Sequence, residues 1–404
     1  MFNRNRLQSV VWEITLKCNA KCLHCGSTAG HERKNELNTQ EALKVCDELA
    51  QNGCKKANII GGELFLRADW QQIMKRLTDN NVGVSIITNA IALNEEKINL
   101  LKDLQIKSLG ISIDGGKAET HDYIRQVPGL FDKIFGLTEY IDKAKLNAVA
   151  VTTLSKLNIL ELPELCEKLA DSSFKAWQIQ IASPHGRMKN DLVLDLFEYY
   201  ISGLFFARSR IKIPMKKLAI LCNHDFGYYS KVIPVHTAYT KWTGCCAGKG
   251  ILGIRSDGRV QGCLSIYEDE FTEGDLNQQT LKKILGSRKF CAWNKRAKRF
   301  LSLKGFCKTC EYALVCLGGC SDIAYSLTGT VKENPQCYHS IESFWKKAVP
   351  KNEFEEVFRA ITQGYMDETG KFHLKSGEIL TEDFVESLNI EDGRKNLLNL
   401  IAVN

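Results

Sequence analysis

The sequence contains no apolar run of about 18 residues, which is the length that a transmembrane helix needs. Residues 1–8 are polar and too short to form a secretory signal peptide. There is also no internal repeat and no low-complexity tract. The chain has 16 cysteines and no export signal, a combination that indicates bound metal in a reducing cytoplasm rather than disulfides. We therefore expect a cytoplasmic protein that contacts no membrane.

The overall composition is that of an ordinary folded protein. A chain of 404 residues is typically divided into about two domains, and a hydrophobic share of 44% is sufficient for a sizeable core. The formal net charge of +7 is mild, so it gives no indication of a nucleic-acid partner. We expect no nucleic acid among the partners.

Three cysteines, Cys18, Cys22 and Cys25, form the motif C-N-A-K-C-L-H-C directly after an apolar, strand-like run. Iron–sulfur cubanes normally take four cysteine ligands. Three thiolates would hold three irons and leave the fourth open to a small molecule. The alternative is a zinc site in a loop, with His24 or His31 as the fourth ligand.

A second motif, Gly61-Gly62-Glu63, follows the apolar run 57–60. Glycines at the end of a strand let a backbone approach a ligand closely, and the adjacent carboxylate can accept hydrogen bonds from an ammonium group. Alone, these three residues would also suit an ordinary turn. Their position about 35 residues behind the cysteine motif makes a shared site the stronger interpretation.

The C-terminal half carries a second array of cysteines. Its pattern is Cys-x11-Gly-x4-Cys, then Cys-x2-Cys-x5-Cys-x3-Cys, then one more cysteine. The seven positions are Cys246, Cys263, Cys307, Cys310, Cys316, Cys320 and Cys337. A Cys-x2-Cys pair alone would also suit a zinc ribbon.

Together these motifs resemble a known family. The three-cysteine motif is similar to the signature of the radical S-adenosylmethionine (SAM) superfamily, and Gly61-Gly62-Glu63 resembles its motif for the SAM amino group. The seven later cysteines match those of the SPASM domain. The resemblance implies SAM and three [4Fe–4S] clusters as cofactors, with one cluster binding SAM and two being auxiliary.

The resemblance also implies how the auxiliary clusters are held. Cys307, Cys310, Cys316 and Cys337 would hold the outer cluster, and Cys246, Cys263 and Cys320 three irons of the inner one. We favour Cys222 as the eighth ligand. The alternatives are Cys245, which adjoins Cys246 and would point away from it in an extended chain, and an open iron.

Six apolar runs alternate with helical stretches between residues 10 and 183. The expected strands are 10–16, 57–60, 84–88, 108–113, 148–153 and 176–182. The expected helices are 39–52, 69–80, 95–102, 131–145, 162–171 and, further on, 192–210. This α/β pattern predicts βα units with right-handed crossovers, in agreement with the partial (β/α)6 TIM-like barrel that the family implies.

We therefore predict four parts. They are the radical SAM partial barrel (1–190), a bridging region (191–240), a small cysteine-rich SPASM domain (241–346) and a helical C-terminal tail (347–404). Because the chemistry of βα barrels lies at the carboxyl ends of the strands, polar residues there are candidates for cofactor binding.

These further candidates are Thr88, Asn89, Ser112, Asp114, Arg125, His24 and Gln178. Gln180 shares one strand face with Gln178. Arg125 belongs to a His121-Asp122-x-x-Arg segment similar to one in the family and could hold a SAM carboxylate, although a surface salt bridge is the alternative. An ordinary turn would explain Asp114. By resemblance, His24 is an adenine contact.

The expected function is that of a radical SAM enzyme modifying a ribosomally made peptide, with a thioether or carbon–carbon crosslink favoured. Side-chain oxidation of the sulfatase-maturase type and epimerisation are alternatives. A non-catalytic iron–sulfur or zinc protein is the rival from another class. Expected partners are a precursor peptide, an electron donor such as flavodoxin or ferredoxin, and a separate peptide-recognition protein, because the chain has no room before residue 10 for such a domain.

Overall fold

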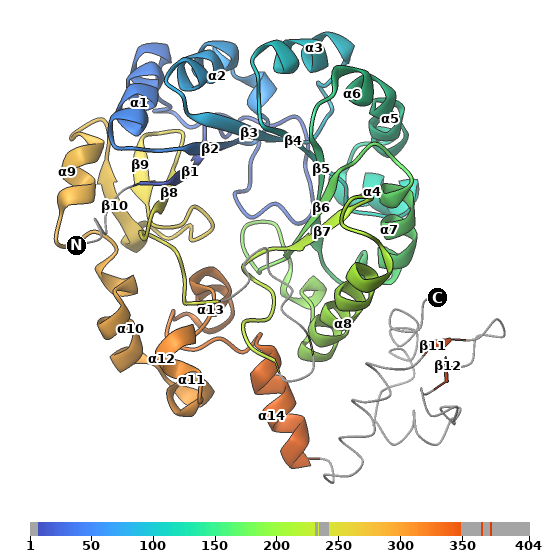
Figure 1. Ribbon diagram of the computed structural model, residues 1–404. Coiled ribbons are helices and arrows are strands. Elements are labelled where there is room, and N and C mark those ends of the chain that lie inside the picture. Colours follow the sequence, from blue (N-terminus) through green and yellow to red (C-terminus); the bar gives the residue numbers. More distant parts are fainter. Residues whose placement is uncertain (1–6, 231–232, 234–241, 349–364, 367–371, 374–404) are drawn as a thin grey trace.

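The computed structural model describes residues 7–230, 233, 242–348, 365–366 and 372–373. Within these residues, ten strands form one sheet in the order β10-β9-β8-β1-β2-β3-β4-β5-β6-β7. The strands curve around the centre of the molecule, and the helices between them lie on the outer side (Figure 1). This arrangement brings the carboxyl ends of the parallel strands to one rim.

The strands from β1 to β7 run parallel to one another. They are β1 (Ser9–Glu13), β2 (Lys56–Ile60), β3 (Gly83–Thr88), β4 (Ser108–Ser112), β5 (Ala148–Leu154), β6 (Ala176–Ile181) and β7 (Ala219–Cys222). The first six are the predicted strands. β7 was not predicted, and it pairs with β6 in the register Ile179 to Cys222.

The helices of this half are amphipathic and cover the sheet. They are α1 (Thr39–Gln51), α2 (Trp70–Asp79), α3 (Glu95–Asp103), α4 (Ala118–Arg125), α5 (Leu130–Gly136), α6 (Thr138–Ala144), α7 (Leu162–Ala170) and α8 (Leu196–Lys212). In α2, for example, Ile73, Met74 and Leu77 are completely buried. The single helix predicted over 131–145 is divided into α5 and α6 at Leu137.

The cysteine-rich half continues the same sheet. β8 (Ile251–Ile254) pairs in parallel with β1, with Ser9 opposite Ile251. β9 (Arg259–Gln261) and β10 (Thr272–Asp275) follow as antiparallel strands. The cysteine-rich segment is therefore joined to the barrel through backbone hydrogen bonds.

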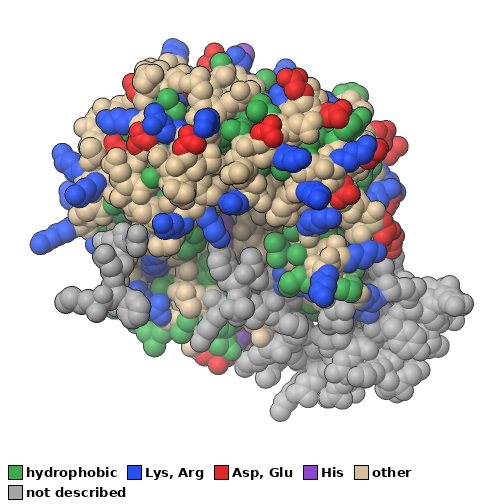
Figure 2. Space-filling view, turned by 45° about the horizontal axis from the view of Figure 1, so that its top comes forward, with side chains coloured by type: hydrophobic (Ala, Val, Ile, Leu, Met, Phe, Trp, Pro, Cys, Tyr) green, Lys and Arg blue, Asp and Glu red, His purple; other side chains and the backbone are tan. Residues whose placement is uncertain are grey.

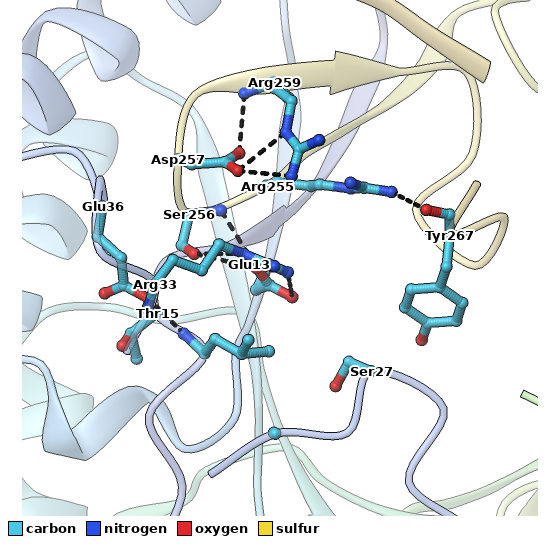
Figure 3. Close-up of polar contacts among 12 residues, drawn as sticks. Glu13, Thr15, Ser27, Arg33, Glu36, Arg255, Ser256, Asp257, Arg259 and Tyr267 are labelled. Carbon is cyan, nitrogen blue, oxygen red and sulfur yellow. Dashed lines mark hydrogen bonds and ion pairs between the residues drawn. The ribbon is translucent and has the colours of Figure 1, made fainter. Parts of the chain in front are cut away.

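A buried carboxylate reinforces this junction. Glu13 of β1 accepts hydrogen bonds from the guanidinium of Arg33 and from both the N–H and the hydroxyl of Ser256, which follows β8 (Figure 3). Burial raises the pKa of Glu13, and the charge of Arg33 opposes that rise. A single side chain thus ties the cysteine loop and the β8–β9 turn to the first strand.

Short helices complete the cysteine-rich half. They are α9 (Leu281–Gly286), α10 (Arg296–Ser302), α11 (Gly305–Thr309), α12 (Ala313–Cys316), α13 (Ser321–Thr328) and α14 (Tyr338–Ala348). α14 returns to the barrel, where the ring of Tyr338 packs 4.9 Å from Tyr199 and 5.5 Å from Tyr200, both on α8.

The helical tail predicted over 347–404 lies almost entirely outside the described residues. Of its described residues, Lys347 and Ala348 end α14, and the other four form a short antiparallel pair, β11 (Tyr365–Met366) and β12 (Phe372–His373). Among the described helices, none is both long and apolar enough to cross a membrane. On the face shown in Figure 2, basic and acidic side chains are interspersed.

Candidate functional site

A cavity of about 320 Å³ opens at the carboxyl ends of the strands. Its walls come from the cysteine loop after β1, from the ends of β2 to β7, and from the cysteine-rich half. The predicted residues that line it are Cys18, Cys22, His24, Cys25, Gly61, Gly62, Thr88, Asn89, Ser112 and Arg125. Glu63, Asp114 and Gln178 are not among the lining residues, and Gln180 lines the cavity in place of Gln178.

The sulfurs of the three-cysteine loop face hydrogen-bond donors. The Sγ of Cys18 accepts from the N–H of Ala20 at 3.5 Å, and the Sγ of Cys25 from the N–H of Ala29 at 3.4 Å. The Sγ of Cys22 lies 3.7 Å from a guanidinium nitrogen of Arg125. Donors of this kind stabilise thiolates, the form that binds iron. The residues present thus fit a cluster held by three cysteines.

Gly61 and Gly62 are required by the backbone that carries these cysteines. A Cβ atom at position 62 would lie 2.3 Å from the carbonyl oxygen of Lys17, and one at position 61 would lie 2.7 Å from that of Thr15. The N–H of Gly62 donates to the Thr15 carbonyl over 2.8 Å. The glycines therefore seat the start of the cysteine loop against the end of β2, a reason that the sequence did not reveal.

Glu63 is buried beneath the cavity rather than exposed to it. Its carboxylate accepts from the Thr88 hydroxyl at 2.9 Å and from the N–H groups of Asn89 and Phe65 at 2.8 and 3.3 Å. Burial raises its pKa, and these hydrogen bonds act against the rise. In this structure its carboxylate orients Thr88 and Asn89 at the cavity wall. The contact of Glu63 with an ammonium group stays a prediction.

Asp114 is the centre of a second buried network. Its carboxylate accepts from His24 Nε2 at 2.9 Å, from Arg125 at 2.5 Å and from the N–H of Thr153 at 2.8 Å. Burial alone would raise its pKa, but Arg125 and then His24 outweigh that effect and hold the pKa well below its usual range. Asp114 is thus no ordinary turn residue, and Arg125 is no surface salt bridge.

His121 supports this network from behind. Its Nδ1 accepts from the N–H of Asp114 at 3.0 Å, so this nitrogen carries no proton. Burial, followed by the charge of Arg125, lowers the pKa of His121 to about 4. The ring is therefore neutral near pH 7 and acts as a hydrogen-bond acceptor.

The loop after β6 clamps the cysteine loop, and sequence reasoning did not identify it. Arg187 donates from Nε to the carbonyl of Cys22 at 2.8 Å and from Nη1 to that of Ala29 at 3.0 Å, and its own N–H donates to the carbonyl of Cys25 at 3.0 Å. A Cβ at the preceding Gly186 would lie 2.4 Å from the Cys25 carbonyl. The only local signal was a turn-like S-P-H-G-R segment.

The cysteine-rich half supplies the opposite wall of the cavity. Tyr267 projects from the loop after β9 towards the cysteine loop (Figure 3), and its hydroxyl would lie 3.0 Å from a Cβ at Gly26. Asp322, in the first turn of α13, accepts from His185 Nε2 at 3.0 Å. The His185 ring packs 5.4 Å from that of Tyr267. These side chains were also missed, because their contacts join segments far apart in the sequence.

The auxiliary cysteines fall into two neighbourhoods. Burial first, and then the nearby Cys316, Cys307 and Cys310, raise the pKa of Cys337. These are the four thiols predicted for the outer cluster. They are close enough to influence one another, as ligands of one cluster must be.

The inner neighbourhood contains Cys245 and does not contain Cys222. Burial first, and then Asp322, Cys245 and Cys263, raise the pKa of Cys320, so these three thiols lie close together. Burial raises the pKa of Cys246 to about 12, and Cys245 adds to that rise. Cys222, which the sequence led us to favour, is instead completely buried in the main barrel core, where β7 pairs with β6.

Comparison with known proteins agrees with this architecture. A model of the radical SAM superfamily matches residues 12–169, and a model of the SPASM iron–sulfur cluster-binding domain matches residues 245–311. The chain thus contains a radical SAM domain followed by a SPASM domain. It is an enzyme, as predicted, and the predicted fold is confirmed.

Several characterised relatives extend over most of the chain. An AdoMet-dependent heme synthase of Methanosarcina barkeri is 29% identical over 352 residues, which cover 84% of this chain and 98% of the relative. Mycofactocin maturase MftC of Mycobacterium tuberculosis is 25% identical over 341 residues, which cover 81% of each protein.

Solved structures share the fold at low identity. SuiB of Streptococcus suis bound to S-adenosylmethionine has a TM-score of 0.66 at 14% identity, with 82% of this chain and 76% of that chain covered. The AdoMet-bound structure of anSMEcpe also has a TM-score of 0.66, at 18% identity, with 87% and 99% covered.

Proposed function

We propose that this enzyme reductively cleaves SAM and uses the resulting radical to modify a ribosomally made peptide, with crosslink formation favoured. The observation that carries the proposal is a single cavity between two cysteine sites. Cys18, Cys22 and Cys25 line one side, while Ser265 and Asp322, each two residues from an auxiliary cysteine, line the other. A substrate in this cavity would reach both sites.

In the proposed site, Cys18, Cys22 and Cys25 hold the cluster that supplies the electron for SAM cleavage. The remaining residues of the cavity wall would bind SAM, orient it and exclude water. Thr88 and Asn89, held by Glu63, offer a hydroxyl and an amide at the cavity wall. Such preorganised polar groups position a cofactor at little entropic cost.

Further groups complete the proposed SAM pocket. Ser112, Arg125, His24 and Gln180 line the cavity together with Gly61 and Gly62. The Nε of Arg125 is buried and has no hydrogen-bond partner among the described residues, and we propose that this donor turns to a ligand carboxylate when SAM is bound. Gln178 lies outside this pocket, and we assign it no role in it.

For the auxiliary clusters, we propose four cysteines each. The outer set is Cys307, Cys310, Cys316 and Cys337. The inner set is Cys246, Cys263, Cys320 and Cys245. Cys245 replaces Cys222 because Cys245, like Cys263, lies close enough to Cys320 to raise its pKa. The local chain around Cys245 and Cys246 is not a strand, so the two side chains need not point apart.

Peptide modification is supported by the names of similar proteins. MftC is a maturase, and SuiB has been solved with its precursor peptide SuiA at a TM-score of 0.65 to this chain. The heme synthase relative supports a second candidate, a reaction on a tetrapyrrole. A tetrapyrrole with carboxylate side chains would need free cationic groups, and Arg187 in the cavity wall is already bound to the carbonyls of Cys22 and Ala29.

The proposed partners are a precursor peptide, an electron donor such as flavodoxin or ferredoxin, and a separate peptide-recognition protein. The test is anaerobic reconstitution followed by measurement of 5′-deoxyadenosine. Candidate peptides encoded beside the gene should increase its formation and gain a mass shift, and Cys25→Ala should abolish both. Turnover of an iron–tetrapyrrole with no response to peptide would refute peptide modification.

A further inference from the structure

Asp225 is a buried carboxylate, and one of its two oxygens has no hydrogen-bond donor among the described residues. It follows β7 and lines the cavity, and the whole residue is only 4% exposed. Its Oδ2 accepts from the N–H of Ile181, at the end of β6, over 2.6 Å. Its Oδ1 is buried and has no hydrogen-bond partner among the described residues. The strand end thus fixes one oxygen of this cavity-wall residue and leaves the other without a donor among the described residues.

An ionised carboxylate in such a position is costly unless a donor or a cation meets it. Burial, the largest effect, raises the pKa of Asp225 to about 6, so that near pH 7 most of the population still carries the charge. The nearby Asp322 adds to this rise rather than relieving it. The site therefore favours a positively charged occupant.

The protein groups around the cavity are engaged elsewhere. Arg125 pairs with Asp114, and Arg187 holds the carbonyls of Cys22 and Ala29. The neighbouring His224 favours the charge of Asp225, but its Nδ1 lies 3.4 Å from the Sγ of Cys320.

Asp322 is the second carboxylate of this wall. Its Oδ1 is 3.0 Å from Nε2 of His185, and this pairing raises the pKa of His185 against the effect of burial. Asp322 therefore has its own partner, whereas Oδ1 of Asp225 has none among the described residues.

We propose that Asp225 binds a cationic group of the substrate, an ammonium or guanidinium such as a lysine or arginine side chain or a free amino terminus. This proposal rests on the proposed function, and it specifies that the part of the substrate entering the cavity is positively charged. The carboxylate would hold the cation on the side of the SPASM domain, while Cys18, Cys22 and Cys25 lie across the cavity. An anionic substrate would be repelled from the same wall.

The test uses the reconstituted, SAM-loaded enzyme and three small probes of equal length: n-butylammonium, n-butanol and butyrate. Calorimetric titration should show that the cation binds more tightly than the alcohol and that butyrate does not bind. Asp225→Asn should weaken the cation about ten- to hundredfold, the effect of losing a charge-assisted hydrogen bond, and leave the alcohol unchanged. Asp191→Asn, an exposed residue outside the cavity, is the charge-matched control and should behave as wild type.

Each other outcome overturns the proposal. If the wild-type enzyme binds the cation and the alcohol equally, the proposal is refuted without any variant. Binding of butyrate that is tighter than binding of the cation would also refute it. A loss of SAM affinity in Asp225→Asn, with iron content retained, would assign the carboxylate to SAM instead. Peptide-stimulated SAM cleavage is measured in a separate assay. If Asp225 binds no cation but peptide still stimulates cleavage, only the role of Asp225 is refuted. If the cation binds but no peptide stimulates cleavage, the proposed function is refuted.

Discussion

The guanidinium of Arg187 donates to the carbonyl oxygen of Cys22 over 2.8 Å and so joins the loop after β6 to the loop after β1. We predict that Arg187→Ala retains the auxiliary clusters but loses most of the SAM-binding cluster, because hydrogen bonds from a charged donor typically contribute about 1.5–3 kcal/mol. Iron analysis should fall by about one third, from about twelve irons to about eight.

The control for this prediction is Arg76→Ala, whose side chain is half exposed and pairs with Asp47 on the outer helices. It should keep full iron content and full SAM cleavage. Equal iron content in Arg187→Ala and wild type, with normal SAM cleavage, would show that the clamp is dispensable.

Gly62→Ala should disrupt the site through the backbone alone. The added methyl group would lie 2.3 Å from the carbonyl oxygen of Lys17, so the cysteine loop must move. We expect destabilisation of about 1–3 kcal/mol, as for overpacking, and poor assembly of the SAM-binding cluster. Gly30→Ala is the matched control in the same loop, because nothing lies within 4 Å of the position that its added methyl group would take. Chemical unfolding and iron-cluster spectra of the two variants should differ clearly, and identical behaviour would contradict the steric argument.

Glu63→Gln should weaken SAM binding indirectly. The amide replaces an acceptor oxygen with a donor, so one of the hydrogen bonds to Thr88 or Asn89 is lost. We expect about a tenfold loss of SAM affinity, with the iron content unchanged. Thr88→Val, which removes the hydroxyl but leaves the carboxylate, should reproduce part of that loss. Calorimetric titration with SAM checks both variants, and full affinity in both would exclude a positioning role.

The fourth ligand of the inner auxiliary cluster can be tested by substituting Cys245 and Cys222 separately. Because Cys245 lies close to Cys320 and Cys263, Cys245→Ser should change the Mössbauer and EPR signals of that cluster. Cys222→Ser should leave all three cluster signals intact and cost only packing energy, since Cys222 lies in the barrel core. The reverse result would restore Cys222 as the ligand. Unchanged spectra in both variants would indicate an iron without a fourth cysteine.

The ion pair of Asp114 and Arg125 predicts a particular pH dependence. The folded-state pKa of Asp114 is depressed, so its stabilising contribution is present above its unfolded pKa of about 3.9 and is lost only as the pH falls through the folded value. Between pH 5 and 8 it should contribute no slope. Arg125→Met would leave the buried carboxylate with only His24 and the N–H of Thr153 as partners and so raise its pKa, and the variant should lose stability as the pH rises.

The expected loss for Arg125→Met is about 3–5 kcal/mol near neutral pH, the usual cost of breaking a buried pair. The double variant Arg125→Met/Asp114→Asn removes the stranded charge and should recover part of that loss. Anaerobic urea unfolding at two pH values measures both effects. A single variant as stable at pH 8 as at pH 5.5 would show that Asp114 finds another partner.

The sequence was informative wherever the signal is local. The six predicted strands all form, because each is an apolar run whose pattern is set by its own residues. The spacing of Cys18, Cys22 and Cys25 likewise predicted a shared site, and all three line the cavity. Thr88 and Ser112, which were predicted from their positions at strand ends, line it too. These strands and motifs are determined by residues that are close together in the sequence.

The features that were missed depend on contacts between distant segments. The clamp by Arg187 joins residues 165 positions apart, and the pair of His185 and Asp322 joins residues 137 apart. β7 begins only after the long helix α8, and its place in the sheet depends on pairing with β6. The partner of Glu63 could not be inferred either, because the motif shows which carboxylate is present but not which way it faces.

The pairing of β8 with β1 has a consequence for how the chain is made. Ser9 leaves the ribosome long before its partner Ile251, so one side of the first strand must wait, unpaired, while most of the barrel is synthesised. An open strand edge of this kind readily pairs with another chain. The pairing that extends the sheet beyond β1 is therefore non-local, and a ribosome-bound intermediate of this protein should need protection from neighbouring chains until β8 has been synthesised.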